Sequence, residues 1–173
     1  MITAKELQQG TLIRYRNEAY IVLDAKYIKP GNGAGYVDTR LQMIKDGRVV
    51  KKIFSPSVQL ETVEKKDEEA KYLSCSKGVC LFQTDEKDVS APEKLCGKAI
   101  DYLPVGADVV LHYYDGELLE ISLPKTVKLS VKDVVKGIAI LETGAKTNVP
   151  YFIKKGDTIL VNTMKGTYLY KIN

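Results

Sequence analysis

Residues 109–123 of this 173-residue chain read VVLHYYDGELLEISL. Two short runs rich in Val, Leu, Tyr and Ile flank an Asp-Gly pair at positions 115 and 116. Those residue types favour strands, and an Asp-Gly pair tolerates the positive φ angles that a tight hairpin turn needs. The stretch therefore predicts a β-hairpin with strands at Val109–Tyr114 and Leu118–Leu123.

The same pattern recurs along most of the chain. Short runs of β-branched and aromatic residues alternate with turns that contain Gly, Asp or Asn, such as Lys45–Arg48 and Lys165–Thr167. Many short strands with regular turns favour small β-barrels over a fold of alternating strands and helices. Further strands are predicted at Thr11–Tyr15, Ala19–Asp24, Tyr36–Met43, Val49–Phe54, Val58–Val63, Val79–Gln83, Val127–Val131 and Thr158–Asn162.

Helical patterning is scarce. The best candidate is Ala91–Leu103, in which Leu95, Ala99 and Tyr102 have helical spacing and Pro92 is tolerable in a first turn. We expect this helix to cap one barrel. The mixed charge run Glu64–Glu69 is expected to be a solvated turn between strands.

The net charge of +4 is unevenly distributed. Residues 1–63 hold ten basic and six acidic residues, 64–127 hold eight and thirteen, and 128–173 hold eight and three. We expect domain boundaries after residues 63 and 127, where the strand pattern pauses. Two basic ends suit contact with a polyanion, although chance variation among solvated faces explains the counts equally well. All four arginines lie in the first segment, and a guanidinium is the better partner for phosphate.

Catalytic and metal sites are not expected. His112 is the single histidine, and it lies in a strand pattern where a packed residue is expected rather than a ligand or base. The sequence indicates no Ser-His-Asp set, no paired carboxylates in a recognisable motif and no well-spaced metal ligands. Cys75 and Cys80 could face each other across a hairpin, but we expect them and Cys96 to be reduced in a cytosolic setting.

Residues 27–36 form a loop rich in glycine, YIKPGNGAGY, between two strand signals. Glycines permit a tight reversal and Pro30 fixes one φ angle, so the loop can project from a barrel. A nucleotide-binding loop is disfavoured, because the Lys-Ser/Thr ending and the following helix of a P-loop are missing.

The chain resembles the elongation factor P family at this loop and beyond it. Lys29-Pro30-Gly31-Asn32-Gly33 matches four of five positions of the family's Lys-Pro-Gly-Lys-Gly loop, whose second lysine is enzymatically extended. Colinear matches follow at Tyr102–Gly106, Tyr114–Glu117, Ile121–Val131, Leu141–Ala145, Val149–Pro150, Phe152–Ile153 and Gly156–Asp157. The resemblance therefore covers nearly the whole chain.

The resemblance implies an all-β fold: an SH3-like (KOW-type) barrel at 1–63, then OB-fold barrels at 64–127 and 128–173. It further implies a translation factor that binds the ribosome beside peptidyl-tRNA and relieves stalls at consecutive prolines. The loop Lys29, Pro30, Gly31, Asn32 and Gly33 would point toward peptidyl-tRNA. Expected phosphate contacts with rRNA and tRNA are Arg14, Arg16, Arg40, Lys154 and Lys155.

The chain departs from the family pattern at three places. Asn32 replaces the modifiable lysine and carries neither an amine nor a charge. The short stretch Val131–Ala139 replaces a longer one with a Gly-Asp-Thr loop, and Asn162-Thr163-Met164 replaces Asp-Thr-Arg. The family's usual extension cannot be attached at Asn32, and the sequence leaves open whether the codon-side contact is retained.

Two functions remain open from the sequence. One is ribosome-bound stimulation of peptide-bond formation, and the alternative is a divergent RNA-binding or ribosome-associated module without stall relief. An enzyme is not expected, nor is a cofactor. No apolar run is long enough to span a bilayer, and the first residues lack a targeting pattern, so we expect a cytoplasmic monomer without membrane contact.

Overall fold

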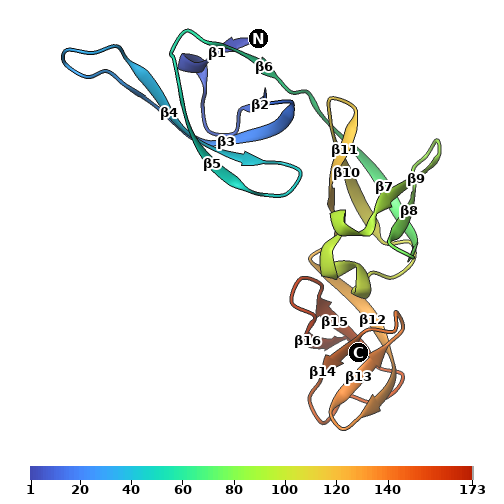
Figure 1. Ribbon diagram of the computed structural model, residues 1–173. Helices are drawn as coiled ribbons and strands as arrows, with labels where there is room; N and C mark the ends of the chain where they lie inside the picture. The colour runs from blue at the N-terminus through green and yellow to red at the C-terminus, as the bar shows by residue number, and fades with distance from the viewer. Residues whose placement is uncertain (173) are drawn as a thin grey trace. The chain divides into compact units, whose positions relative to one another are not determined.

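The computed structural model describes residues 1–172, and its regular secondary structure is almost entirely β-strand (Figure 1). Its strands form one six-stranded and two five-stranded sheets, which follow one another along the chain. The predicted all-β class is confirmed. In residues 1–172 no helix is long and apolar enough to cross a membrane.

The first sheet has the strand order β1-β6-β2-β3-β4-β5. Val22, Val37 and Leu41 point from β3 and β4 into its core, because alternate residues of a strand face the same side. A register shift between Val22 and Asp24 marks a β-bulge in β3. The strands are β1 (Ile2–Thr3), β2 (Leu12–Tyr15), β3 (Glu18–Ile28), β4 (Tyr36–Met43), β5 (Val49–Phe54) and β6 (Gln59–Thr62), with the 3-10 turn η1 (Ala4–Glu6) after β1.

The second sheet has the order β11-β10-β7-β8-β9. Ala70 and Tyr72 of β7 and Phe82 of β8 alternate with exposed residues and fill its interior. The elements are β7 (Lys65–Ser76), β8 (Val79–Gln83), β9 (Asp88–Pro92), η2 (Glu93–Leu95), η3 (Gly97–Tyr102), β10 (Asp108–Tyr114) and β11 (Glu117–Ser122).

The third sheet has the order β14-β13-β12-β15-β16. The Thr147 hydroxyl on edge strand β14 donates to the Gly166 carbonyl at the β15–β16 turn, 2.8 Å away. This bond brings the two edges of the sheet together, as closure into a barrel requires. The strands are β12 (Thr126–Val135), β13 (Ile138–Leu141), β14 (Lys146–Asn148), β15 (Thr158–Asn162) and β16 (Thr167–Ile172).

Two compact units are distinguished by their internal packing. One comprises Met1–Lys66 with the hairpin tip Tyr113–Glu120, and the other comprises Asp67–His112 with the chain from Ile121 onward. Within the first unit, Tyr114 and Leu119 of the hairpin tip pack against other buried side chains, Ala19 and Val63. The predicted boundary after residue 63 falls between β6 and β7, whereas the one after residue 127 falls inside β12, near its start. The division into three domains stays a prediction.

Several strand predictions match residue for residue: β4, β5, β8 and β15. Strands β1, β7, β9, β13, β14 and β16 were not predicted. The prediction of a solvated turn at Glu64–Glu69 is wrong, because Lys65 begins the twelve-residue strand β7. Its charged, exposed first half disguises a strand that lies between β10 and β8 in the folded sheet.

The predicted helix at Ala91–Leu103 is also wrong. Strand β9 continues to Pro92, and two short 3-10 turns, η2 and η3, follow. Gly97 has a φ of +68°, which an α-helix cannot accommodate, so the helical spacing ends between the two turns.

The expectation of three reduced cysteines is wrong as well. Cys75 and Cys80 are directly opposite each other on β7 and β8 and form a disulfide. Cys96 is a buried free thiol whose Sγ lies 3.9 Å from that of Cys80. Burial, with a smaller effect of Glu93, raises the pKa of the Cys96 thiol to about 11, so it stays protonated at neutral pH.

Candidate nucleic-acid interface

The loop Lys29–Gly33 joins the two longest strands of the first sheet, β3 and β4. Figure 1 shows these strands as a hairpin that extends beyond the rest of that sheet. All five loop residues are exposed, Asn32 among them. Backbone support is limited to one long bond, in which the Gly33 N–H donates to the Pro30 carbonyl at 3.5 Å. The loop is therefore presented to solvent with side chains available for contact.

Tyr27 braces the base of this loop. A Cβ on Gly35 would lie 2.5 Å from the Tyr27 hydroxyl oxygen and 2.7 Å from a ring carbon, so a larger residue would require the Tyr27 ring to move. Lys5 of η1 makes a cation–π contact with the same ring, its Nζ lying 4.9 Å from the ring centroid. Gly35 therefore has a packing role, which could not be recognised from its position in the sequence.

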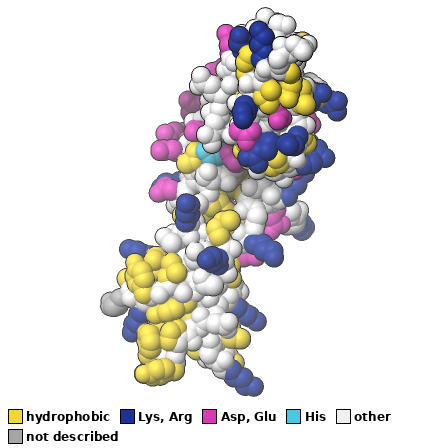
Figure 2. Space-filling model, turned by 90° about the vertical axis from the view of Figure 1, so that its left-hand side faces the viewer, with side chains coloured by type: hydrophobic (Ala, Val, Ile, Leu, Met, Phe, Trp, Pro, Cys, Tyr) yellow, Lys and Arg dark blue, Asp and Glu magenta, His cyan; other side chains and the backbone are white. Residues whose placement is uncertain are grey.

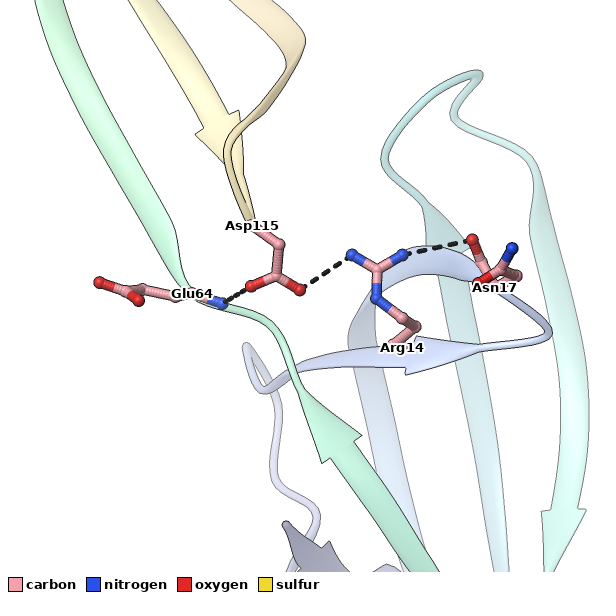
Figure 3. Close-up of polar contacts among 4 residues, drawn as sticks. All are labelled: Arg14, Asn17, Glu64 and Asp115. Atoms are coloured by element: carbon pink, nitrogen blue, oxygen red, sulfur yellow. Dashed lines mark hydrogen bonds and ion pairs between the residues drawn. The ribbon is translucent and has the colours of Figure 1, made fainter.

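Two of the predicted phosphate contacts are already engaged within the first unit. The Arg40 Nε donates to an Asp24 carboxylate oxygen at 2.6 Å, across a directly paired position of β3 and β4. The Arg14 guanidinium donates to the Asp115 carboxylate at 2.9 Å and to the Asn17 carbonyl at 3.2 Å (Figure 3). A phosphate would have to compete with these carboxylates.

Asp115 is the centre of the contact that Figure 3 shows. Its second carboxylate oxygen accepts the Glu64 N–H at 2.9 Å, and its own N–H donates to the Glu64 carbonyl at 2.8 Å. The hydrogen bond from Arg14, together with that from Glu64, lowers the pKa of the Asp115 carboxyl below its ordinary value. The turn of the β10–β11 hairpin is thereby attached to the segment that precedes β7.

Arg16 belongs to a basic pocket that sequence reasoning missed. A cavity of about 600 Å³ is lined by the aromatic ring of Tyr15 and by four cations. The cations are Arg16, Arg48 in the turn before β5, and Lys51 and Lys52 on β5. Both Arg16 and Lys52 approach the Tyr15 ring, at 5.3 and 5.6 Å from its centroid. The lining residues are Tyr15, Arg16, Glu18, Tyr20, Met43, Arg48, Val50, Lys51 and Lys52. Four cations and an aromatic ring that line one cavity suit a phosphate and an adjoining base.

Lys154 and Lys155 are exposed in the turn before β15, as a phosphate contact requires. Tyr151 precedes them with 97% of its surface exposed, and its ring meets that of Phe152 edge-on, 5.7 Å between centroids. Figure 2 shows hydrophobic side chains gathered over the C-terminal sheet, in the lower part of the view, with basic side chains nearby. The exposed large hydrophobic residues of this sheet and its turns are Val135, Ile138, Tyr151, Phe152, Met164, Leu169 and Tyr170.

The β12–β13 connection is a two-residue turn. Lys136 and Gly137 have φ angles of +50° and +77°, and Val135 pairs directly with Ile138. Two consecutive positive φ angles are the mark of a type I′ hairpin. This turn lies in the short stretch Val131–Ala139, which replaces the longer loop of the family pattern.

Comparison with known proteins places these features in a family. The profile described as "Elongation factor P (EF-P) KOW-like domain" matches residues 3–60, and "Elongation factor P, C-terminal" matches residues 125–171. The elongation factor P of Mycolicibacterium vanbaalenii is 31% identical over the full length of both chains. The chain belongs to the elongation factor P family. An equally similar relative, also 31% identical over both full lengths, is elongation factor P of Prochlorococcus marinus.

The family explains the predicted fold and functional class. A KOW-like N-terminal domain and a translation elongation factor of the elongation factor P type are both confirmed. In fold, the chain resembles eukaryotic translation initiation factor 5A from Methanococcus jannaschii, with a TM-score of 0.57 and 13% identity. That likeness covers 70% of this chain and 91% of the other.

One sequence-based statement about chemistry is contradicted. Three residues from different strands, Asp67, His112 and Ser122, are joined by hydrogen bonds in the order Asp-His-Ser. The expectation that the chain has no Ser-His-Asp set is therefore wrong. The β10–β11 hairpin was predicted from the sequence, but sequence alone could not find this set, because β7 becomes the neighbour of β10 only in the folded sheet.

Proposed function

We propose that this member of the elongation factor P family binds the ribosome beside peptidyl-tRNA and stimulates peptide-bond formation with an unmodified loop tip. The observation that carries the proposal is the exposed loop Lys29–Gly33 at the end of the β3–β4 hairpin. It occurs in a chain that matches its relatives over their whole length.

The loop would act by positioning rather than by chemistry. Fixing a poorly aligned peptidyl-tRNA removes part of the entropic barrier to reaction on the ribosome. The Asn32 amide can donate and accept hydrogen bonds to RNA but brings no charge. Lys29 is the one cation within Lys29–Gly33, so electrostatic attraction to the tRNA backbone at this tip would depend on it.

The body of the factor would hold RNA through its basic regions. In the first unit we assign phosphate contacts to the pocket of Arg16, Arg48, Lys51 and Lys52, because its cations surround an open cavity. Arg14 and Arg40 are assigned a smaller share, since carboxylates already hold them. In the C-terminal sheet we assign contacts to Lys154 and Lys155, with rRNA and tRNA as partners. We expect the factor to act as a monomer in the cytoplasm.

A second candidate is an RNA-binding or ribosome-associated module without stall relief. Two observations favour it: Asn32 offers no acceptor for the modification, and the β12–β13 turn is only two residues long. The basic pocket and the exposed lysines would serve this function equally well.

A poly-proline synthesis assay separates the two functions. A reconstituted ribosome system lacking its own factor is supplied with the wild-type protein, Lys29→Ala or Asn32→Ala. Stall relief by the wild type, lost in Lys29→Ala while ribosome binding persists, is the expected result. Binding without any gain in the rate of proline incorporation would favour the second candidate.

A further inference from the structure

The outer face of the second sheet carries a connected row of three polar side chains. His112 Nδ1 lies 2.6 Å from an Asp67 carboxylate oxygen, and His112 Nε2 lies 2.6 Å from the Ser122 Oγ. The three residues come from β7, β10 and β11, which are neighbours in the sheet. Leu111 and Ile121, their neighbours on β10 and β11, are buried, and adjacent residues of a strand face opposite sides of the sheet.

In the neutral form of His112, its partners select which ring nitrogen carries the proton. A carboxylate only accepts hydrogen bonds, so Asp67 requires the N–H on Nδ1 of a neutral imidazole. Nε2 is then unprotonated and accepts a hydrogen bond from the Ser122 hydroxyl. Nucleophile, base and orienting carboxylate therefore stand in the arrangement that activates serine in hydrolases of unrelated folds.

The serine is open to solvent while the base is protected. His112 is 8% exposed, whereas Ser122 at the end of β11 is exposed. Beside Ser122 lies a cavity of about 390 Å³, whose apolar lining includes Val110, Leu123 and Pro124. Two carboxylates, Glu69 and Asp108, also border it, and they disfavour an anionic ligand.

We propose that Ser122 is an activated nucleophile that accepts acyl groups from small uncharged esters bound in this cavity. His112 is the general base, and Asp67 is a positioning residue that acts through His112. This activity is independent of ribosome binding, because it needs no residue of the loop or of the basic regions.

In the reaction, the Ser122 Oγ forms a bond to the ester carbonyl carbon while its proton passes to His112 Nε2. The tetrahedral intermediate collapses, the bond from carbon to the alcohol oxygen breaks, and the leaving alkoxide takes the proton from His112. Water then attacks the acyl group with His112 again as base, releasing the carboxylic acid and restoring the serine. General base catalysis of this kind contributes about 10²- to 10⁴-fold in rate.

The test uses the full-length protein and a fluorophosphonate probe. Ser122 Oγ bonds to phosphorus as fluoride leaves, and the serine proton passes through His112 to solvent. Peptide mass spectrometry then compares the labelling rate at Ser122 with that at Ser90, an exposed serine on β9. We expect Ser122 to react about 100-fold faster or more. Equal rates at the two serines of the wild-type protein would overturn the proposal.

Variants assign the roles of the other two residues. His112→Gln should reduce the Ser122 labelling rate to that of Ser90, and Asp67→Asn should reduce it in the same direction. Asp67→Glu, which retains a carboxylate, should restore part of the rate. Hydrolysis of p-nitrophenyl acetate should fall with the labelling rate and disappear in Ser122→Ala. A His112→Gln protein that stays folded and labels as fast as the wild type would exclude His112 as the base.

Discussion

The Arg14 guanidinium and the Asp115 carboxylate lie 2.9 Å apart, although 101 residues separate them in the sequence. Both groups are partly shielded, with side-chain exposures of 24% and 35%. The pair joins β2 to the tip of the β10–β11 hairpin, which the packing assigns to the same compact unit. Arg14 therefore has a structural role in addition to any contact with RNA.

A double-mutant cycle of Arg14→Met and Asp115→Asn should show positive coupling in the free energy of unfolding. We expect about 1 kcal/mol, toward the upper end for partly exposed ion pairs, because the hydrogen bond is charge-assisted. Urea unfolding of the four proteins measures the coupling. The Arg40–Asp24 pair is the matched control: its side chains are 50% and 56% exposed, so its coupling should be smaller. Equal coupling in both pairs would contradict this assignment.

The same contact predicts a sign for the pH dependence of stability. Hydrogen bonds from Arg14 and Glu64 lower the pKa of Asp115 in the folded protein. Its stabilising contribution is complete above the ordinary aspartate pKa of about 4 and is lost as the pH falls through the lower folded pKa. The difference in unfolding free energy between wild type and Asp115→Asn should therefore shrink as the pH is lowered from 5 toward 2. If the difference in unfolding free energy grew over this range, the lowered pKa of Asp115 would be refuted.

RNA affinity should depend on the basic pocket of the first unit. Replacing Lys51 and Lys52 with Gln removes two charges that line the cavity, without disturbing a buried residue. The slope of log affinity against log salt should fall by roughly 0.7–0.9 for each lost phosphate contact, as counterion release requires. Filter binding to ribosomes or tRNA at several salt concentrations measures it. Lys77→Gln and Lys87→Gln, exposed lysines of the acidic middle segment, are the control and should leave the slope unchanged.

The Cys75–Cys80 disulfide should stabilise the protein under oxidising conditions. Closing so short a loop lowers the conformational entropy of the unfolded chain, which stabilises the folded protein by about 2 kcal/mol in the chain-entropy account. Cys75→Ala should lose this stabilisation in the absence of reductant, whereas the difference from wild type should nearly vanish in dithiothreitol. Cys75 is preferable to Cys80 for this test because Cys80 is fully buried, and its replacement would add a packing cost. Identical unfolding curves with and without reductant would show that the disulfide contributes nothing.

Asn32→Lys should create an acceptor for the family's modification and add a charge to the loop tip. The surrounding residues Lys29, Pro30, Gly31 and Gly33 already match the modified loop. The contacts of the body are unchanged, so the rate of proline incorporation should rise while ribosome affinity stays the same. The measurement compares wild type, Asn32→Lys and Asn32→Ala with the modifying enzyme present. A wild type that matches a fully modified factor, with no loss in Asn32→Ala, would show that this tip is irrelevant.

Much of the fold could be predicted from local patterns. Strands β4, β5, β8 and β15 were predicted residue for residue, because their β-branched and aromatic residues are bounded by turn residues. The loop Lys29–Gly33 was recognised because its glycines and proline form a distinctive short motif. Strand β7 escaped prediction because exposed positions dominate its first half, and only pairing within the sheet stabilises it.

The sequence by itself determined that the chain is all β, which loop is exposed between β3 and β4, and where its charges lie along the chain. These properties depend on neighbouring residues, which local propensity and turn chemistry describe. Only the tertiary structure decided that Arg14 meets Asp115, that Arg16 joins Lys52 around Tyr15, and that Cys75 is bonded to Cys80. It also placed Asp67 and Ser122 on either side of His112. Such contacts depend on which strands become neighbours in a sheet. The strand order is set by the burial of apolar side chains from segments that lie far apart in the sequence.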